Sequence, residues 1–185
     1  MKINIIGPSG SGKTHLAKLL SEKYKVLNVN LDEVLFIKLS GKKRKEANKD
    51  RYLKKLKNIF KKKEWIIEGL QPIKEVLDEA ETIIWLRPPF YISLYQQWKR
   101  YFNDKEQREN YGFLNNLKLS RYILRQYFGK PTLITNPKKT WIKSAGKELR
   151  KYEDKLIIIR KNCEKEDLAK LKKGKKLDTS RVISP

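Results

Sequence analysis

The chain has 185 residues, 39% of them hydrophobic, which is enough for one well-cored globular domain and too little for two full-sized ones. Its 44 Lys and Arg residues outnumber its 21 Asp and Glu residues, so the formal net charge is +23. The single cysteine, Cys163, excludes an internal disulfide and a cysteine-based zinc cluster. No apolar run reaches the roughly 20 residues of a membrane-spanning helix, and the N-terminus lacks a signal-peptide pattern, so we expect a cytoplasmic protein without a membrane partner.

The high positive charge has two interpretations. Long-range attraction would concentrate nucleic acid or nucleotides at so basic a surface. Alternatively, a lysine-rich composition simply leaves many solvated lysines on helix surfaces. Composition leaves both open, so nucleic acid is a possible partner.

Short apolar runs alternate with segments of helical periodicity along most of the chain. Residues 52, 53, 56, 59 and 60, for example, mark the apolar face of a helix whose other faces are rich in lysine. The alternation predicts an α/β fold with a parallel sheet sandwiched by helices. The apolar runs indicate five buried strands, at Ile3–Ile6, Lys25–Val29, Trp65–Glu68, Thr82–Leu86 and Leu156–Arg160.

The stretch 88–150 breaks this alternation, because it shows several helical patterns and no convincing strand. We interpret it as an enlarged helical lid region within a single domain, 1–185, whose core comprises residues 1–87 and 151–171. The tail 172–185 is polar and basic, and we expect it to be loose.

A glycine-rich loop directly follows the first expected strand and matches the phosphate-loop pattern G-x-x-x-x-G-K-[ST]. Its glycines let the backbone turn N–H groups toward the β- and γ-phosphates of a nucleotide, Lys13 supplies a positive charge, and the Thr14 hydroxyl can ligate Mg²⁺. The sequence therefore predicts that nucleotide is bound by Gly7, Pro8, Ser9, Gly10, Ser11, Gly12, Lys13 and Thr14.

Acidic residues follow the second and third expected strands, at the sheet edge where ligands bind. Asp32 could orient an acceptor hydroxyl, hold a magnesium-bound water or act as a base, although the helix dipole alone would also favour an acid there. Glu68, followed by Gly69, suggests a substrate or metal site at the end of the third strand. Asp32 is thus a candidate catalytic residue, and Asp32, Glu68 and Gly69 are candidate acceptor-binding residues.

Arginines are relevant because phosphoryl transfer places charge on oxygens that guanidinium groups can clamp. Arg100 and Arg108 are the preferred catalytic candidates besides Lys13. Arg121 and Arg125, spaced i and i+4 on one helix face, are candidate lid residues. Any one of these arginines could instead be a solvated surface charge.

With these residues in place, the chain resembles the adenylate-kinase-like P-loop proteins, the group of topology-modulation and adenylate-kinase-related proteins. The resemblance covers most of the chain except 38–63, 103–138 and the tail. It implies a P-loop NTPase fold with a five-stranded parallel sheet and a lid, ATP as donor with Mg²⁺, and a nucleotide or other small molecule as acceptor. Besides the phosphate loop it rests on Leu31-Asp32, Trp65-Ile66-Ile67-Glu68-Gly69, Ile83-Ile84-Trp85-Leu86-Arg87-Pro88-Pro89 and Trp98-Lys99-Arg100.

Two departures from the group's pattern concern the acceptor. Arg87 stands where the group has an acid, and the segment after Gly69 lacks the arginine with which nucleotide kinases commonly hold an acceptor phosphate. Lys74 or a lid arginine would have to replace it, which makes Lys74 a further acceptor candidate. By position, the resemblance assigns Asp32 and Glu68 to the acceptor or magnesium side and Arg100 to the lid side.

Three functions fit these observations. The leading hypothesis is an ATP-dependent phosphotransferase of the nucleoside-monophosphate-kinase type. A polynucleotide 5′-hydroxyl kinase would use the same loop, with Asp32 as base and the basic surface holding the strand. A nucleotide-dependent binding protein would bind ATP without phosphorylating a small acceptor. ATP is preferred to GTP because the chain has no base-reading N-K-x-D motif.

Overall fold

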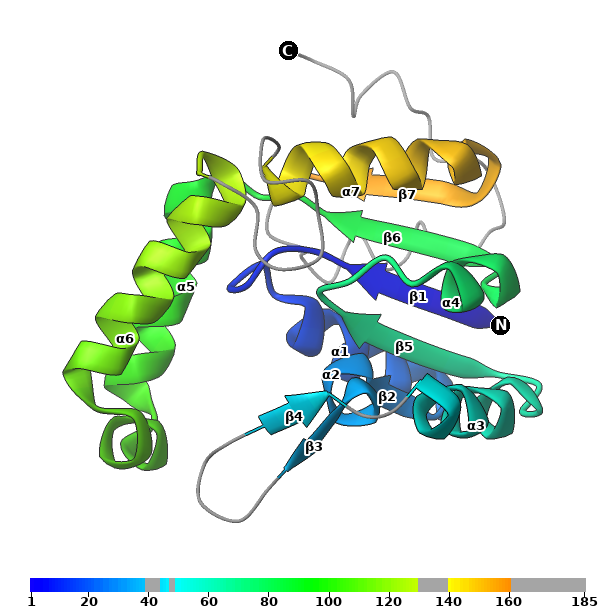
Figure 1. Cartoon of the computed structure of the whole chain (residues 1–185), viewed down its shortest axis with the longest axis horizontal. Coiled ribbons are helices and arrows are strands. Elements are labelled where there is room, and N and C mark those ends of the chain that lie inside the picture. The colour runs from blue at the N-terminus through cyan, green and yellow to red at the C-terminus, as the bar shows by residue number, and fades with distance from the viewer. Residues whose placement is uncertain (39–43, 47–48, 130–139, 161–185) are drawn as a thin grey trace.

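The structure, a computed structural model, describes residues 1–38, 44–46, 49–129 and 140–160. Its central sheet has five parallel strands in the order β2-β5-β1-β6-β7 (Figure 1). Each of the five expected strands is therefore confirmed, with small differences at the ends. The strands are β1 (Lys2–Ile6), β2 (Asn28–Asn30), β5 (Trp65–Gly69), β6 (Thr82–Leu86) and β7 (Leu156–Ile159).

Helices follow the strands, as the alternating pattern predicted. A small antiparallel hairpin, β3 (Phe36–Lys38) with β4 (Arg44–Glu46), is an addition that the sequence patterns did not indicate. Strands of three residues are too short for alternation of apolar and polar residues to reveal them. The helices are α1 (Lys13–Tyr24), α2 (Leu31–Leu35), α3 (Lys49–Phe60), α4 (Lys74–Glu79), α5 (Phe90–Asn103), α6 (Lys105–Tyr127), α7 (Trp141–Leu149) and the 3-10 helix Arg150–Lys155.

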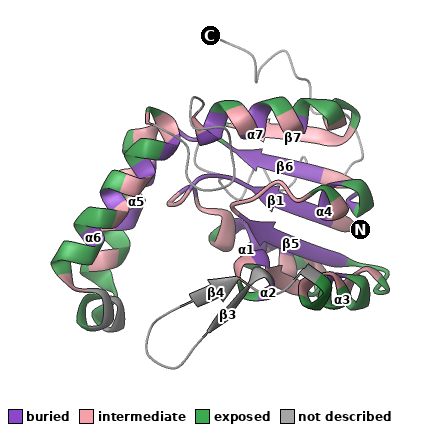
Figure 2. Ribbon diagram, in the orientation of Figure 1, coloured by how far each residue is buried: buried purple, intermediate pink, exposed green. Residues whose placement is uncertain are grey.

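The three inner strands β1, β5 and β6 are buried (Figure 2), which is why they read as nearly continuous apolar runs, whereas the edge strands β2 and β7 are of intermediate exposure. Neighbouring residues of a strand point to opposite faces. Ile6 and Ile67 belong to the core beneath α2, α3, α4 and α7, whereas Ile5 and Ile66 belong to the core beneath α1. Helices on both sides thus enclose the sheet, as expected.

Segment 88–150 divides into two parts. Helix α7 buries Trp141, Ala145 and Leu149 in the same core as Trp85 of β6, whereas α5 and α6 form a helical hairpin that extends beyond the sheet (Figure 1). Gly112, with φ 65° and ψ 164°, interrupts α6 near its start. Of the described helices in this segment, α5 and α6 lie outside the core, and their role as a lid stays a prediction. The tail 172–185, the core segment 161–171 and Cys163 lie outside the described residues.

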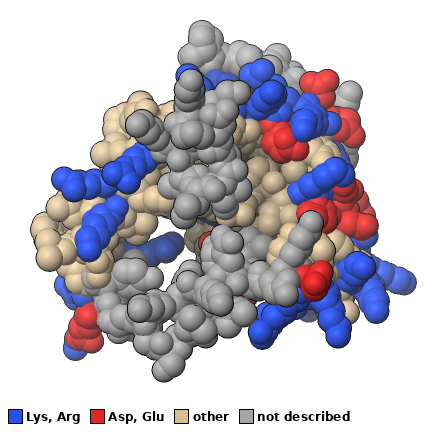
Figure 3. Space-filling model, in the orientation of Figure 1, with Lys and Arg blue, Asp and Glu red and all other residues tan. Residues whose placement is uncertain are grey.

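The basic surface is spread over several elements. Lys and Arg side chains lie on the α5–α6 hairpin and around α3 (Figure 3), where Lys54, Lys55 and Lys57 are exposed.

None of the helices in the described part of the chain is long and apolar enough to cross a bilayer.

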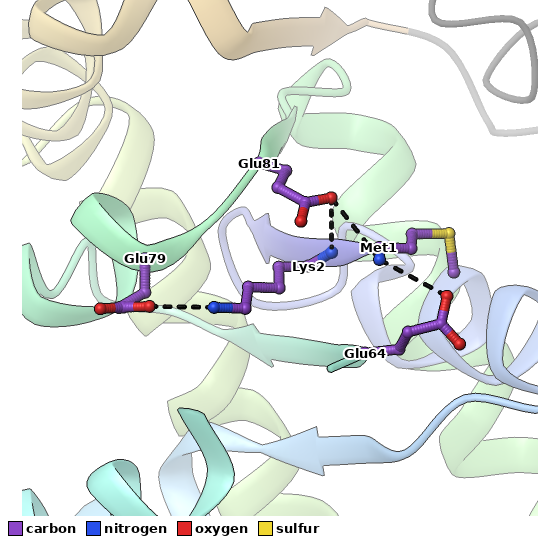
Figure 4. Close-up of polar contacts among 5 residues, drawn as sticks. All are labelled: Met1, Lys2, Glu64, Glu79 and Glu81. Carbon is purple, nitrogen blue, oxygen red and sulfur yellow. Dashed lines mark hydrogen bonds and ion pairs between the residues drawn. The ribbon is translucent and has the colours of Figure 1, made fainter. Parts of the chain in front are cut away.

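Exposed ion pairs hold the amino ends of the strands (Figure 4). The Met1 ammonium lies 3.4 Å from Glu64 Oε1 and 3.5 Å from Glu81 Oε2, and Lys2 Nζ lies 3.1 Å from Glu79 Oε2. Exposed pairs typically contribute less than about 1 kcal/mol each. They lie at the edge of the sheet opposite the glycine loop, so the geometry of that loop does not depend on them.

Two leucines give a matched test of this core. Leu77 of α4 is fully buried, whereas Leu114 of α6 is 71% exposed. Leu77→Ala should lower the free energy of unfolding by about 2–5 kcal/mol, because it removes buried methyl groups and leaves a cavity. Leu114→Ala should change it by less than about 0.5 kcal/mol. Urea unfolding of both variants measures the difference, and equal losses would contradict the placement of α4 in the core.

Candidate functional site

The glycine loop lies between β1 and α1 at the carboxyl edge of the sheet. Gly10 (φ 74°) and Gly12 (φ 86°) adopt left-handed conformations that side chains disfavour. A Cβ atom at Gly10 would also lie 2.4 Å from the Ser93 carbonyl oxygen of α5, so this position requires glycine for space as well.

The loop presents backbone donors as a phosphate-binding loop must. Among the described residues, none accepts a hydrogen bond from the N–H groups of Gly10, Gly12, Lys13 or Thr14. Lys13 and Thr14 also begin α1, whose positive end favours an anion. With β5 and β6 flanking β1 in a parallel sheet, the strand, loop and helix have the P-loop arrangement. This is the P-loop NTPase fold.

Lys13 folds back over the loop. Its ammonium donates a hydrogen bond to the Pro8 carbonyl oxygen at 2.9 Å. The residue as a whole is half-buried, but its ammonium is surrounded by protein, and this desolvation lowers the pKa of Lys13 to about 8 against the opposing effect of Glu68 and Asp32. The hydrogen-bond acceptor of the ammonium is a neutral carbonyl, and a bound phosphate would give it a negatively charged partner.

Glu68 ends β5, the strand that pairs with β1, and places a carboxylate next to the loop. Thr14 Oγ1 donates a hydrogen bond to Glu68 Oε1 at 3.0 Å. Glu68 is only 3% exposed, and burial raises the pKa of its carboxyl while Lys13 and the Thr14 hydroxyl oppose the rise. The structure thus brings together Lys13, Thr14 and Glu68, as the sequence predicted.

Asp32 lies at the start of α2, on the other side of β5. Its backbone N–H donates to Asn30 Oδ1 at 2.9 Å, a helix cap that fixes where α2 begins. Gly69 allows this helix to approach, since a Cβ atom there would lie 2.7 Å from Leu31 Cβ. The charge of Asp32 is near enough to raise the pKa of both Lys13 and Glu68.

The oxygen atoms of Thr14 and Glu68 suit Mg²⁺. Magnesium prefers hard oxygen ligands and is usually held by one or two carboxylates together with substrate phosphates. A hydroxyl and a buried carboxylate oxygen 3.0 Å apart provide such donors beside the loop. No group of three or more His, Cys, Asp or Glu side chains among the described residues could hold a metal ion. One hydroxyl oxygen and one carboxylate fit a metal whose other ligands are phosphates of a nucleotide and water.

The candidate cations differ in position. Arg100 is exposed, and its charge is near enough to lower the pKa of Lys13. Arg108 is exposed, and Arg121 and Arg125 are exposed on the face of α6 away from its buried residues. Lys74 is paired with Asp78, at 2.5 Å. The roles assigned to these last four residues stay predictions.

Two contacts of the site escaped sequence reasoning. The Ser9 backbone N–H donates to Gln126 Oε1 of α6 at 3.0 Å. The Tyr127 hydroxyl donates to the Pro88 carbonyl oxygen at 2.8 Å and lies 2.9 Å from Ser93 Oγ. These contacts join positions 34 to 117 residues apart, and no local sequence pattern marks such pairs.

No protein-family model and no curated protein matches the chain. Among solved structures, it is similar to the shikimate kinase of Acinetobacter baumannii in complex with shikimate, with 17% identity over 82% of this chain and 92% of that chain and a TM-score of 0.37. The Aquifex aeolicus shikimate kinase is 18% identical over 83% of this chain and 97% of that chain, with a TM-score of 0.40. A Sinorhizobium meliloti gluconokinase is 12% identical over 92% of this chain and 92% of that chain, with a TM-score of 0.43. Similarity this low transfers no substrate, and the fold assignment rests on the sheet and the loop.

The buried ammonium of Lys13 should lower the stability of the nucleotide-free protein. Because its pKa falls from 10.5 to about 8, the unfolded chain binds more protons between these values, and stability should increase as the pH rises through this window. Lys13→Met should abolish that increase. At pH 7 it should raise the melting temperature by a few degrees, at about 2–4 °C per kcal/mol for a chain of this size.

Differential scanning fluorimetry across pH measures this effect. Lys18→Met, at an exposed position of the same helix, is the matched control and should leave the pH dependence unchanged. A lower melting temperature for Lys13→Met than for the wild type would contradict the cost assigned to the ammonium.

Proposed function

We propose that the protein is an ATP- and Mg²⁺-dependent phosphotransferase that transfers the γ-phosphoryl group to a small acceptor. The observation that carries this proposal is the hydrogen bond between Thr14 Oγ1 and Glu68 Oε1 at 3.0 Å, beside the Lys13 ammonium. A loop hydroxyl and an acid at the end of the neighbouring strand are the pair that holds Mg²⁺ in P-loop NTPases. Their proximity in this chain supports chemistry at the loop in addition to binding.

Each residue has a distinct task in this proposal. The open N–H groups of the loop bind the β- and γ-phosphates. The Lys13 ammonium stabilises the negative charge on the phosphoryl group during transfer. Thr14 and Glu68 would hold Mg²⁺, which when bound neutralises charge on the phosphate oxygens. Asp32 would orient the acceptor hydroxyl or accept its proton, since it lies on the opposite side of Glu68 from the loop.

Arg100 would act from the hairpin side. Its charge lowers the pKa of Lys13, which supports the proposal that Arg100 stabilises the transferred phosphoryl group. We assign the acceptor to nucleotides or similarly small hydroxyl or phosphate compounds, in keeping with the adenylate-kinase-like resemblance. In this proposal the exposed residues Arg108, Arg121 and Arg125 would contact the phosphates only if the hairpin moved toward the loop.

Transfer of label from γ-labelled ATP tests the function. The acceptors should include nucleosides, nucleoside monophosphates, small hydroxy acids and sugars, and 5′-hydroxyl oligonucleotides. We expect a labelled small product that requires Mg²⁺ and is lost in Lys13→Ala. Labelled oligonucleotide, with a yield that falls steeply with salt, would instead favour the polynucleotide kinase. Bound ATP with no labelled acceptor would contradict the phosphotransferase.

Glu68→Gln tests the metal assignment. The variant keeps the shape of the side chain but removes a charged ligand, so the Mg²⁺ concentration for half-maximal activity should rise about 10- to 100-fold. Because burial raises the pKa of Glu68, the wild type without nucleotide should lose stability as the pH rises through that pKa, and the variant should not.

Magnesium titrations of activity and pH-dependent melting measure the two effects. Glu79→Gln, which breaks the ion pair with Lys2 at the far edge of the sheet, is the control and should change neither. An unchanged magnesium requirement in Glu68→Gln would exclude Glu68 as a ligand.

A further inference from the structure

Gln126 is buried in α6 at a place where an apolar side chain would be more stable. It is 1% exposed, and its Nε2 has no hydrogen-bond partner among the described residues. A buried donor without a partner costs about 1–3 kcal/mol. Its Oε1, however, accepts the N–H of Ser9 in the phosphate loop at 3.0 Å. A residue with this unfavourable burial and this one contact suggests a role in the site.

The contact reaches Lys13 through a single rigid unit. The Pro8 carbonyl and the Ser9 N–H belong to the same peptide group, which is planar and whose two polar ends point in opposite directions when it is trans. The carbonyl oxygen accepts a hydrogen bond from the Lys13 ammonium at 2.9 Å, and the N–H donates a hydrogen bond to Gln126 Oε1 at 3.0 Å. The same carbonyl also accepts a hydrogen bond from the Ser11 N–H at 3.2 Å. Rotation of this peptide would therefore break all three hydrogen bonds at once.

The loop needs such an external anchor. Two of its residues, Gly10 and Gly12, are glycines in left-handed conformations, and glycine backbones lose more entropy on ordering than others. The next residue of α6, Tyr127, is itself fixed by hydrogen bonds to Pro88 and Ser93. The end of α6 is thus tied to the start of α5 and can hold the loop (Figure 1).

We propose that Gln126 is a positioning residue, which holds the Pro8–Ser9 peptide in the orientation that places Lys13 for the phosphates of the nucleotide. The loop and Lys13 are then ordered before the nucleotide arrives, so less of the binding energy is lost in ordering them. The consequence for catalysis rests on the proposed function, whereas the consequence for the loop and for nucleotide binding does not.

Gln126→Met tests the inference, with Gln97→Met as the matched control. Gln97 is also a buried glutamine, but its amide bonds Asn116 and Ser120 between α5 and α6 and does not touch the loop. Gln126→Met should weaken ATP binding about 3- to 10-fold, the loss expected for one hydrogen bond, while the melting temperature stays equal or rises. Gln97→Met should do the reverse, lowering the melting temperature and leaving ATP affinity within twofold.

Calorimetric titration with ATP in the absence of acceptor gives the affinities. In a Lys13→Met background, Gln126→Met should weaken ATP binding by less than twofold, because the two residues act through one peptide. Additive losses would overturn the route through Lys13. A lower melting temperature with unchanged affinity in Gln126→Met would reduce Gln126 to a structural residue.

Amide hydrogen exchange provides a readout that needs neither nucleotide nor activity. The Ser9 N–H should be protected in the wild type, exchange faster in Gln126→Met, and stay protected in Gln126→Glu, which keeps an oxygen acceptor. Rapid exchange of Ser9 in the wild type would overturn the proposal. If the wild type binds ATP and phosphorylates nothing, the proposed function fails, but the affinities and the exchange rates still decide the role of Gln126.

Discussion

The parallel pairing of β1 with β5 determines the geometry of the candidate site. In this register Ile5 lies beside Glu68 and Ile6 beside Gly69, so the acid emerges where the chain of β1 turns into the phosphate loop. Thr14 can then reach Glu68, and Gly69 lets α2 approach with Asp32. A shift of one residue would turn the Glu68 side chain to the other face of the sheet. The buried isoleucines on both faces fix the register, so core packing and chemistry share one constraint.

The same constraint explains why part of the molecule can be predicted from its sequence. Buried parallel strands are short apolar runs, and the glycine pattern has a local cause in the positive φ angles of Gly10 and Gly12. The five strands, the loop and the proximity of Lys13, Thr14 and Glu68 follow from these local patterns and from the rule that strand ends meet at one edge.

What escaped prediction depends on contacts between distant segments. Whether a helix of segment 88–150 belongs to the core cannot be read from its apolar spacing, which is similar in α5 and α7, yet α7 packs on Trp85 and α5 extends beyond the sheet. Gln126 has no sequence signal for the same reason, since its partner Ser9 is 117 residues away. The exposed arginines of α6 are a second example of what local spacing cannot predict. A spacing of i and i+4 places two residues on the same helix face, but it does not say whether that face points toward the site or toward solvent.

The electrostatics of the site give the α5–α6 hairpin a physical reason to matter. The pKa of Glu68 is lowered by the charge of Lys13 and raised by the charges of Asp32 and Glu33, so several acids already lie near the ammonium before a polyanionic nucleotide arrives. Under the proposed function, additional positive charge would have to accompany the phosphates, and Mg²⁺ at Thr14 and Glu68 would supply only part of it. Arg100 is the hairpin cation already within electrostatic reach of Lys13. The Ser9–Gln126 hydrogen bond joins the hairpin to the loop, so in the proposed function Arg100 would approach the phosphates at a more defined distance than an arginine on an unattached surface.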